Sequence, residues 1–383
     1  MKILILGHGV RGRTYERYAR AHPDEYEIVG IADPVSPAAT VRDWQEALSI
    51  PADAAIIALP DRLHCAAAKA ALAKGLHILL EKPIGCSWAE CEEIKAAAAR
   101  ARRLVLTGYV LRFAAYYRRL TEILRAGVIG ELTSLHHLVA ISYGKAAHAF
   151  CRGNWAREAD GTSTLVQKCT HDFDLIAWWS RGKACRRLAS FGSLQHWRPE
   201  NAPAGAAARC TDCPAAVRAA CPFDAEKLYC ARTDLRYHFA DESDAAMAKV
   251  VAESRYGRCV YACGNDAVDH QTVLMEFDGG LTATLEMESF SARRGRTTHF
   301  YGTRGEIAAD GETIEIRPFG GEPQVIVPAQ HGNHGGGDRE IMSAFARLVA
   351  TASPARYAGF LETALVSHRL AFRAEEERKR HDD

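Results

Sequence analysis

The sequence predicts an α/β protein in which a doubly wound parallel sheet is followed by a second, strand-rich domain. In the first third of the chain, short apolar strands alternate with helical segments, the pattern of a parallel sheet with helices on both faces. Further along, residues 270–277 and 281–290 read as strands on either side of a DGG turn at 278–280, which is typical of an antiparallel hairpin. A chain of 383 residues is long enough for two such domains.

Five apolar segments are predicted to form the parallel sheet. Each is short and rich in Ile, Leu, Val or Ala, as expected for strands that are buried on both faces. One of the helices between them begins at Ser87 with Glu90 three residues later, a capping-box pattern. The predicted strands are residues 2–6, 26–32, 54–59, 78–80 and 104–107, and the predicted helices are residues 13–21, 61–74 and 87–103.

A glycine-rich turn (GHGVRG, residues 7–12) joins the first strand to the first helix. Gly7 permits the tight turn, Gly9 lets a diphosphate approach the backbone, and Gly12 lets the helix pack against the strand. The amino terminus of the helix supplies a dipole and free N–H groups for the phosphates. In this strand–turn–helix context, the motif predicts a dinucleotide site.

The second strand ends at Asp33, about 20 residues after Gly12, where a carboxylate is expected to bind the adenosine ribose hydroxyls. A carboxylate at this position repels a 2′-phosphate, so the sequence favours NAD over NADP. Arg11 and Arg13 lie close by in the sequence and keep NADP as an alternative.

A second polar group is predicted at the carboxyl end of a buried strand, within residues 76–85 (LHILLEKPIG). In an open parallel sheet that end faces the ligand crevice, so Glu81 and Lys82 are expected to lie beside the ligand. Pro83 fixes its own φ and restricts Lys82 to an extended backbone, which sets the direction of the lysine. The alternative is a surface Glu–Lys pair in a turn.

The bulk composition excludes several classes of function. With 48 basic and 47 acidic residues, the chain has no electrostatic case for binding nucleic acid or a membrane surface. No apolar run approaches the ~18 residues of a membrane span, and the chain opens directly into a strand. We therefore expect a soluble, cytoplasmic protein. Twelve cysteines suggest free thiols or a metal site before a disulfide framework.

An ordered set of motifs along most of the chain resembles the Gfo/Idh/MocA family of NAD(P)-dependent oxidoreductases. The matching segments are GHGVRG (7–12), ALPDRLH (58–64), HILLEKPIG (77–85), GYVLRF (108–113), AGVIGEL (126–132), HDFDLIAWW (171–179) and GTRGEI (302–307). The resemblance implies a Rossmann domain, here residues 1–124, followed by an α/β domain with a large, mostly antiparallel sheet, here residues 125–383. It also implies a homodimer or homotetramer.

The resemblance also assigns roles to individual residues. Lys82 would sit beside the nicotinamide and the reacting hydroxyl. The residues expected to bind the cofactor are Gly7, Gly9, Val10, Arg11, Gly12, Asp33, Pro60, His64, Glu81 and Lys82.

The segment 165–179 carries the second half of the expected chemistry. His171 and Asp174 are three residues apart and share a helix face. Similar proteins have an Asp four residues before this histidine, whereas this chain has Gln167, followed by Lys168. Because Gln cannot hold a proton, Lys82 and His171 remain as the candidate catalytic proton carriers. The alternative is a core histidine bonded to Asp174.

Polar and aromatic residues after the predicted strand near residues 131–142 would suit a sugar, since aromatic faces pack on sugar rings. Tyr143 and His148 are expected in a loop there, with Trp155 close by. Ordinary surface polarity is the alternative. The candidate substrate residues are Arg112, Tyr143, Trp155, Gln167, Lys168 and Asp174.

A cysteine-rich segment near residues 205–232 is expected to be an insertion into the sheet domain. Its CxxC spacing and two further cysteines would suit a tetrahedral zinc site that staples the loop. Free thiols, an iron–sulfur cluster and a disulfide are the alternatives. The candidate ligands are Cys210, Cys213, Cys221 and Cys230, with Cys259 and Cys263 as other choices for the fourth position.

The combined prediction is an NAD(P)-dependent oxidoreductase that acts on a sugar, cyclitol or related polyol. Two other classes stay open. The first is a glycosidase that uses bound NAD transiently, which Gln167 and the HGGGD segment (334–338) leave room for. The second is a non-catalytic NAD-binding protein. The missing Asp and the cysteine-rich insertion favour this class.

Overall fold

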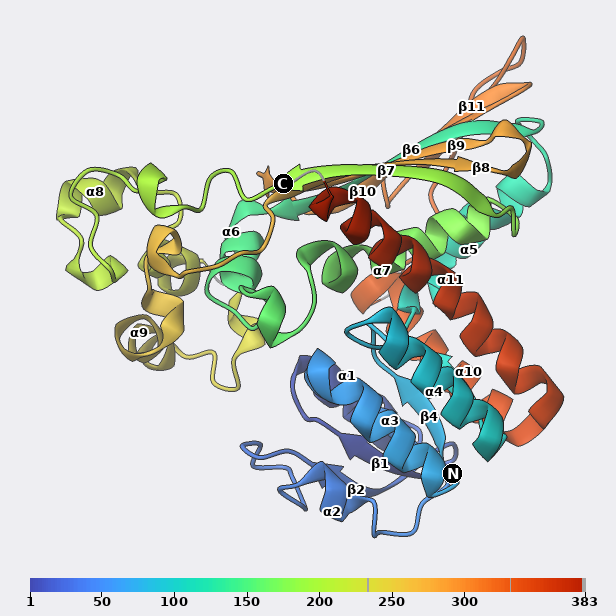
Figure 1. Cartoon of the computed structure of the whole chain (residues 1–383), viewed down its shortest axis with the longest axis horizontal. Helices are drawn as coiled ribbons and strands as arrows, with labels where there is room; N and C mark the ends of the chain where they lie inside the picture. Colours follow the sequence, from blue (N-terminus) through green and yellow to red (C-terminus); the bar gives the residue numbers. More distant parts are fainter. Residues whose placement is uncertain (233, 331, 381–383) are drawn as a thin grey trace.

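The computed structural model describes residues 1–232, 234–330 and 332–380, which form two sheets with helices between and around them (Figure 1). The first sheet has the strand order β2-β1-β3-β4-β5, and every pairing in it is parallel. This confirms the predicted doubly wound parallel sheet. Its strands are β1 (Lys2–Leu6), β2 (Glu27–Ala32), β3 (Ala54–Ile57), β4 (His77–Leu80) and β5 (Val105–Thr107).

Helices cover both faces of this sheet, because its strands are apolar on both faces. Ile3 and Ile5 pack with α1, whereas Leu4 and Leu6 pack with α3 and α4 on the other side. The Ser87 side chain caps α4 by accepting the Glu90 N–H, as predicted. The helices are α1 (Val10–Ala21), α2 (Trp44–Ala47), α3 (His64–Ala73) and α4 (Trp88–Ala101).

The second sheet has eight strands in the order β13-β12-β11-β10-β6-β9-β8-β7. All its pairings are antiparallel except that of β6 with β9. The mostly antiparallel sheet is therefore confirmed, including the predicted hairpin. Its strands are β6 (Leu132–Ser142), β7 (Cys185–Ser193), β8 (His270–Phe277), β9 (Thr282–Ser291), β10 (Gly295–Gly302), β11 (Gly305–Ala309), β12 (Ile314–Pro318) and β13 (Gln324–Ile326).

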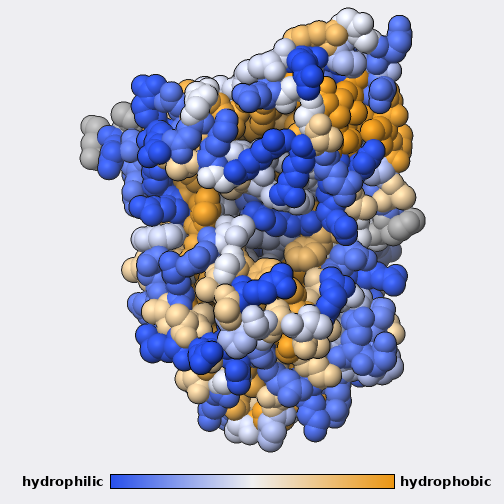
Figure 2. Space-filling view, turned by 90° about the vertical axis from the view of Figure 1, so that its right-hand side faces the viewer, coloured by the Kyte–Doolittle hydropathy of each residue, from blue (hydrophilic) through white to orange (hydrophobic). Residues whose placement is uncertain are grey.

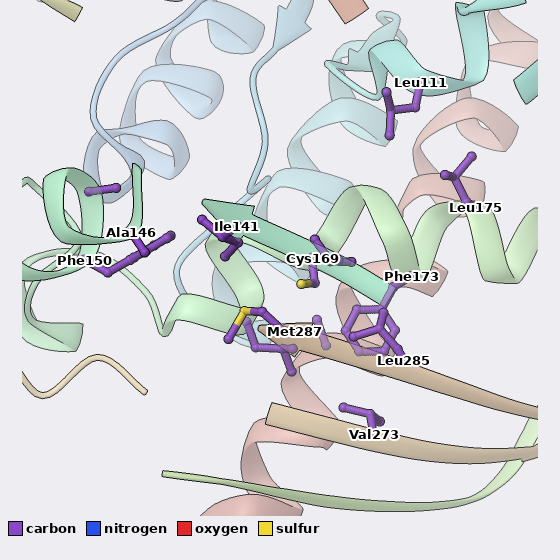
Figure 3. Packing of buried hydrophobic residues seen from close by; sticks show 14 of the residues in the cluster. Leu111, Ile141, Ala146, Phe150, Cys169, Phe173, Leu175, Val273, Leu285 and Met287 are labelled. Carbon is purple, nitrogen blue, oxygen red and sulfur yellow. The ribbon is translucent and has the colours of Figure 1, made fainter. Parts of the chain in front are cut away.

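Helix α7 (Thr164–Trp179) packs on the inner face of the second sheet. Figure 3 shows Cys169 and Phe173 of this helix over Leu285 and Met287 of the sheet. The strands alternate, so Val273 is buried while its neighbour Leu274 is 46% exposed on the outer face. Figure 2 shows hydrophobic surface gathered in the upper part of the molecule, at the level of this sheet in Figure 1. The predicted homodimer or homotetramer stays a prediction.

The last two helices, α10 (Gly337–Thr351) and α11 (Pro354–Lys379), return to the first sheet. In Figure 1, α11 runs from the second sheet down to the side of the first. Ile341 of α10 joins the core on the α1 face, and Leu361 of α11 joins the core on the opposite face. Helix α11 begins before the predicted start at residue 361, because Pro354 at its first position is well suited to open a helix. The boundary at residue 124 stays a prediction.

Further helices precede or connect the strands of the second sheet. Tyr143 and His148 are helical, whereas a loop was predicted there, because β6 leads directly into α6 (Tyr143–Ala146) and a π-helical turn at Ala147–Cys151. None of the helices described here is long and apolar enough to cross a membrane. The other helices of this part are α5 (Ala115–Arg125), α8 (Ala215–Ala220) and α9 (Asp244–Glu253).

Candidate active site

The glycine-rich turn leaves room for a diphosphate at the start of α1. Gly9 is the N-cap, and no side chain caps the helix, so its first N–H groups remain available. A Cβ on Gly9 would meet no atom within 4 Å, whereas one on Gly12 would lie 2.0 Å from the Gly7 carbonyl oxygen. Gly12 is therefore required for packing, and the space beside Gly9 and Val10 fits a phosphate.

The Asp33 carboxylate lies at the end of β2 beside this turn. It accepts hydrogen bonds from the backbone N–H groups of His8 (2.8 Å), Val35 (3.0 Å) and Ser36 (2.8 Å). Burial acts to raise the pKa of Asp33, but these bonds outweigh it and hold the pKa below its usual value. The group is therefore ionised and fixed in orientation, as a ribose-binding carboxylate needs to be.

Arg11 and Glu81 face each other across the first domain. The Arg11 Nε donates to Glu81 Oε1 at 2.6 Å, and the Tyr15 hydroxyl donates to the same oxygen. Another Arg11 nitrogen donates to Asp338 at 2.8 Å, in the HGGGD segment. These contacts direct both predicted cofactor residues toward α1 and α10. A guanidinium held in this way is not available to a 2′-phosphate.

His64 holds the turn that carries Lys82. Its ring is buried, with Nδ1 2.6 Å from the Pro83 carbonyl oxygen and Nε2 2.9 Å from the Leu59 carbonyl oxygen. Pro60 begins the short turn that leads to His64 and accepts the Leu63 N–H. The His64 ring therefore positions the backbone at the crevice and has both nitrogens occupied within the chain. The Lys82–Pro83 peptide bond is cis.

Lys82 reaches across the crevice to α7. Its Nζ donates to the backbone carbonyl of Gln167 at 2.5 Å. Burial lowers the pKa of Lys82, while the negative charges of Asp61 and Glu81 oppose that shift. Asp61 was not predicted as a site residue. Its buried carboxylate accepts the indole N–H of Trp155 at 2.9 Å, which brings the predicted Trp155 to the same crevice.

His171 lies one turn after Gln167 on α7 and has no hydrogen-bond partner within the described ranges. Its Nδ1 is buried and unpaired, which leaves Nε2 as the nitrogen for a ligand. Burial, and then the charge of Lys82, hold the pKa of His171 well below its usual value. The ring is therefore neutral, although its reference pKa predicted titration near neutral pH.

Asp174 does not pair with His171, so the core-histidine alternative fails in the form we considered. Its two carboxylate oxygens accept hydrogen bonds from Arg112, at 2.6 and 2.9 Å. The Arg112 guanidinium also stacks on Trp178, 5.3 Å from the ring centroid. Both residues were predicted to bind substrate, but the structure places them against each other. The remaining aromatic candidate, Tyr143, accepts a hydrogen bond from Arg232 at 2.8 Å.

Asp172 forms a buried charged network beside the site that the sequence did not predict. It accepts from Arg296 of β10 and lies 2.8 Å from Nε2 of His137 on β6. Burial acts to raise the pKa of Asp172, but Arg296 and His137 outweigh it and keep the carboxylate ionised. The HDFD motif contains this acid, but its partners lie on distant strands.

Two further lysines stand near Lys82. Burial, and then the charge of Arg296, lower the pKa of Lys168 to about 8, with a contribution from Lys82. Lys145, which the sequence did not predict, has a pKa lowered to about 7 by burial and then by Lys168 and Lys82. The role predicted for Lys168 in binding substrate stays a prediction.

The predicted zinc site is not supported. Among the described residues, no three His, Cys, Asp or Glu side chains are gathered to hold a metal, and all twelve cysteines are free thiols. Burial raises the pKa of Cys210 and Cys221, which disfavours the thiolate that zinc needs. Arg152, a buried cation, donates to Cys210 at 3.4 Å. Cys210, Cys213, Cys221 and Cys259 line a cavity of about 20 Å³, which Cys230 does not reach.

Comparison with known proteins identifies a family match for the amino-terminal domain. Residues 1–109 match the model of an oxidoreductase family, Gfo/Idh/MocA, with an NAD-binding Rossmann fold. The amino-terminal domain of the chain belongs to the Gfo/Idh/MocA family. The family has the NAD-binding fold that the glycine-rich turn and Asp33 predicted.

Three similar proteins show how far the similarity extends along the chain. The Bacillus subtilis protein YteT is 24% identical over 349 residues, covering 82% of this chain and 80% of YteT. Inositol 2-dehydrogenase 1 of Saccharopolyspora erythraea is 35% identical over 127 residues, covering 33% of this chain and 34% of that protein. The structure of an inositol dehydrogenase homolog complexed with NAD+ from Azotobacter vinelandii covers 99% of this chain and 95% of its own, with a TM-score of 0.70 and 15% identity. That last likeness shows the fold.

Proposed function

We propose that this chain transfers a hydride between NAD, or alternatively NADP, and a CH–OH group of a sugar, cyclitol or related polyol. The observation that carries the proposal is the approach of Lys82 to α7. Its Nζ contacts the Gln167 carbonyl oxygen, one turn before His171, so an ammonium group lies beside the helix that carries an unpaired imidazole. The names of the dehydrogenase relatives support this class of substrate.

The cofactor would lie between the glycine-rich turn and this pair. The turn (7–12) would hold the diphosphate and Asp33 the adenosine ribose. When bound, NAD supplies a nicotinamide ring that accepts the hydride from the carbinol carbon. The crevice-facing groups of the second domain then need only to orient the substrate and move its proton.

Lys82 binds the substrate oxygen. Its ammonium group donates a hydrogen bond to the reacting hydroxyl and stabilises negative charge that develops on that oxygen. Asp61 favours the charged form of Lys82 against the effect of burial. Glu81 opposes the effect of burial in the same way, so both carboxylates favour the ammonium form of the lysine.

His171 accepts the proton. The O–H bond breaks as the proton passes to Nε2, and the C–H electron pair leaves as hydride, so that the carbinol becomes a carbonyl. The hydroxyl proton becomes strongly acidic as the hydride departs, so a neutral imidazole with a lowered pKa suffices. In the reverse direction the protonated ring would return the proton to the carbonyl oxygen.

The proposal is tested by Lys82→Met, which removes the charge and keeps much of the apolar stem. We expect kcat to fall about 10²- to 10⁴-fold on any active sugar or polyol, with NAD affinity retained. Lys74→Met, at an exposed lysine beyond α3, is the control. Turnover that survives Lys82→Met within a few fold would show that the assigned role is wrong.

The same assay separates the two other classes. A glycosidase would cleave a glycoside without net NADH production. A non-catalytic protein would bind NAD and turn over none of a broad panel of sugars.

A further inference from the structure

The crevice around Lys82 holds more positive charge than the proposed hydride transfer uses. Lys145, on α6, places its Nζ 2.5 Å from Nε2 of His238 and 5.9 Å from the ring centroid of Tyr237. Lys168 directly follows Gln167, whose carbonyl oxygen binds Lys82. In the described part of the chain, neither Lys145 nor Lys168 forms an ion pair.

The carboxylates near these lysines already have partners, and Glu81, which also acts on Lys82, is paired with Arg11. Asp172 is shared by Arg296 and His137, and Asp61 accepts the Trp155 N–H. Lys82, Lys145, Lys168 and Arg296 act on one another electrostatically, and Asp61 and Asp172 are too few to neutralise these four cations. Such a cluster is costly in a low-dielectric crevice unless a negatively charged ligand completes it.

The position of the cluster favours the substrate over the cofactor as that ligand. Lys168 lies on the same helix as His171, and the charge of Lys82 acts on both Lys145 and Lys168. The phosphates of the cofactor are expected at Gly9, where the start of α1 provides its own N–H donors.

We propose that the substrate is an anionic sugar, whose carboxylate or phosphate group is bound by Lys145 and Lys168 while Lys82 and His171 meet the reacting hydroxyl. This inference rests on the proposed function for the identity of the reacting site. Lysines suit this task because an ammonium group binds either kind of anion as a point charge.

The test measures sugar binding to the full-length protein saturated with NADH, by isothermal titration calorimetry at low and high salt. The probes are D-glucuronate, D-glucose 6-phosphate and UDP-glucose, each compared with D-glucose. We expect at least one anionic probe to bind about tenfold or more tightly than glucose, and its advantage to shrink with salt. The double variant Lys145→Gln/Lys168→Gln should lose about 10- to 100-fold for that probe only.

Lys249→Gln is the matched control, since this lysine lies exposed on α9 and contacts only Glu253 at 3.9 Å. The inference is overturned if no anionic probe binds, or if glucose binds equally well. It is also overturned if the double variant weakens NADH binding in the same proportion, because the lysines would then serve the cofactor phosphates. If an anionic sugar binds selectively but no sugar is oxidised, the proposed hydride transfer is contradicted and the inference about the anionic ligand is not.

Discussion

The backbone N–H of Ile84 donates a hydrogen bond to Nε2 of His368 at 2.8 Å, joining the Lys82 turn to the last helix. An amide can only donate, so Nε2 accepts and the ring proton resides on Nδ1, 2.7 Å from the Tyr109 hydroxyl. Burial lowers the pKa of His368 to about 3, so the ring stays neutral and this arrangement persists at physiological pH. Helix α11 therefore fixes the backbone that presents Lys82.

Replacing His368 by Leu leaves the Ile84 N–H buried without an acceptor. We expect a stability loss of about 1–3 kcal/mol and a roughly tenfold lower kcat, with the NAD affinity unchanged. His368→Gln, whose amide oxygen can reach the Nε2 position, should recover most of kcat. Urea unfolding and steady-state kinetics measure the two effects, and Glu362→Ala on the exposed face of α11 is the control. Equal losses with Gln and Leu would argue against this positioning role.

Gly9 and Gly12 should respond differently to alanine. Gly9→Ala adds a methyl group into open space, so the fold stays stable while the affinity for NAD falls about tenfold or more. Gly12→Ala forces a Cβ to 2.0 Å from a carbonyl oxygen, so the free protein itself should be destabilised by several kcal/mol. Thermal unfolding with and without NAD distinguishes the two variants. If Gly9→Ala binds NAD as tightly as the unchanged protein, the diphosphate does not bind at this turn.

Asp33 sets the choice between the two dinucleotides. Removing its ionised carboxylate in Asp33→Ala should weaken NAD binding and strengthen NADP binding, so that their ratio shifts about tenfold or more. Arg42 supports the shift, since its guanidinium donates to the Ser36 carbonyl oxygen at 2.9 Å and lies near the vacated position. Fluorescence titration with both reduced cofactors gives the ratio. If the ratio of NAD to NADP affinity does not change, the adenosine ribose does not bind at Asp33.

The Arg112–Asp174 pair should contribute to the stability of the fold. Asp174→Leu leaves a partly buried guanidinium unpaired and should cost about 3 kcal/mol in unfolding experiments. The double variant Arg112→Met/Asp174→Leu removes both charges and should recover much of that loss. If Arg112 contacts the substrate instead, Arg112→Met would raise KM about tenfold even in the double variant.

The two crevice lysines predict a pH dependence of KM. The pKa of Lys145 is about 7 and that of Lys168 about 8 in the free protein, so both are charged at pH 6 and neutral at pH 9. The charged forms bind an anion, so KM for an anionic sugar should rise about tenfold or more between these limits. His238, with a pKa lowered to about 3 by burial and by Lys145, stays neutral over this range, while Arg296, whose pKa is raised by Asp172 against the effect of burial, stays charged.

The pH profile is measured on one anionic sugar and on its neutral parent. For the neutral parent, KM should not follow this rise. The variant Lys145→Gln/Lys168→Gln should flatten the profile of the anionic sugar. A rise of the same size for both sugars would point to another titrating group.

Local patterns predicted the parts of the site that depend on neighbouring residues. The glycine-rich turn, Asp33 and the end of β4 could be read from the sequence because strand ends and turns are encoded locally. Asp174 was misjudged for the opposite reason. Its spacing from His171 favoured a helical pair, but Arg112, 62 residues away, offers two hydrogen bonds to the same carboxylate.

Long-range partners account for the rest of what the sequence did not predict. Arg296 meets Asp172 across 124 residues, and His368 meets Ile84 across 284. The sequence pattern around one residue of each pair does not predict its distant partner. For the cysteines, spacing alone suggested a metal, but it could not reveal Arg152 buried beside Cys210.

The return of α10 and α11 to the first sheet has a consequence for synthesis on the ribosome. The strands of the first sheet are translated before the second sheet, yet Phe345 and Leu361, which complete the two cores of the first sheet, are translated after it. A nascent chain that ends before α10 exposes both apolar faces near β5. Translation must therefore proceed through α11 before the layer made earlier can close.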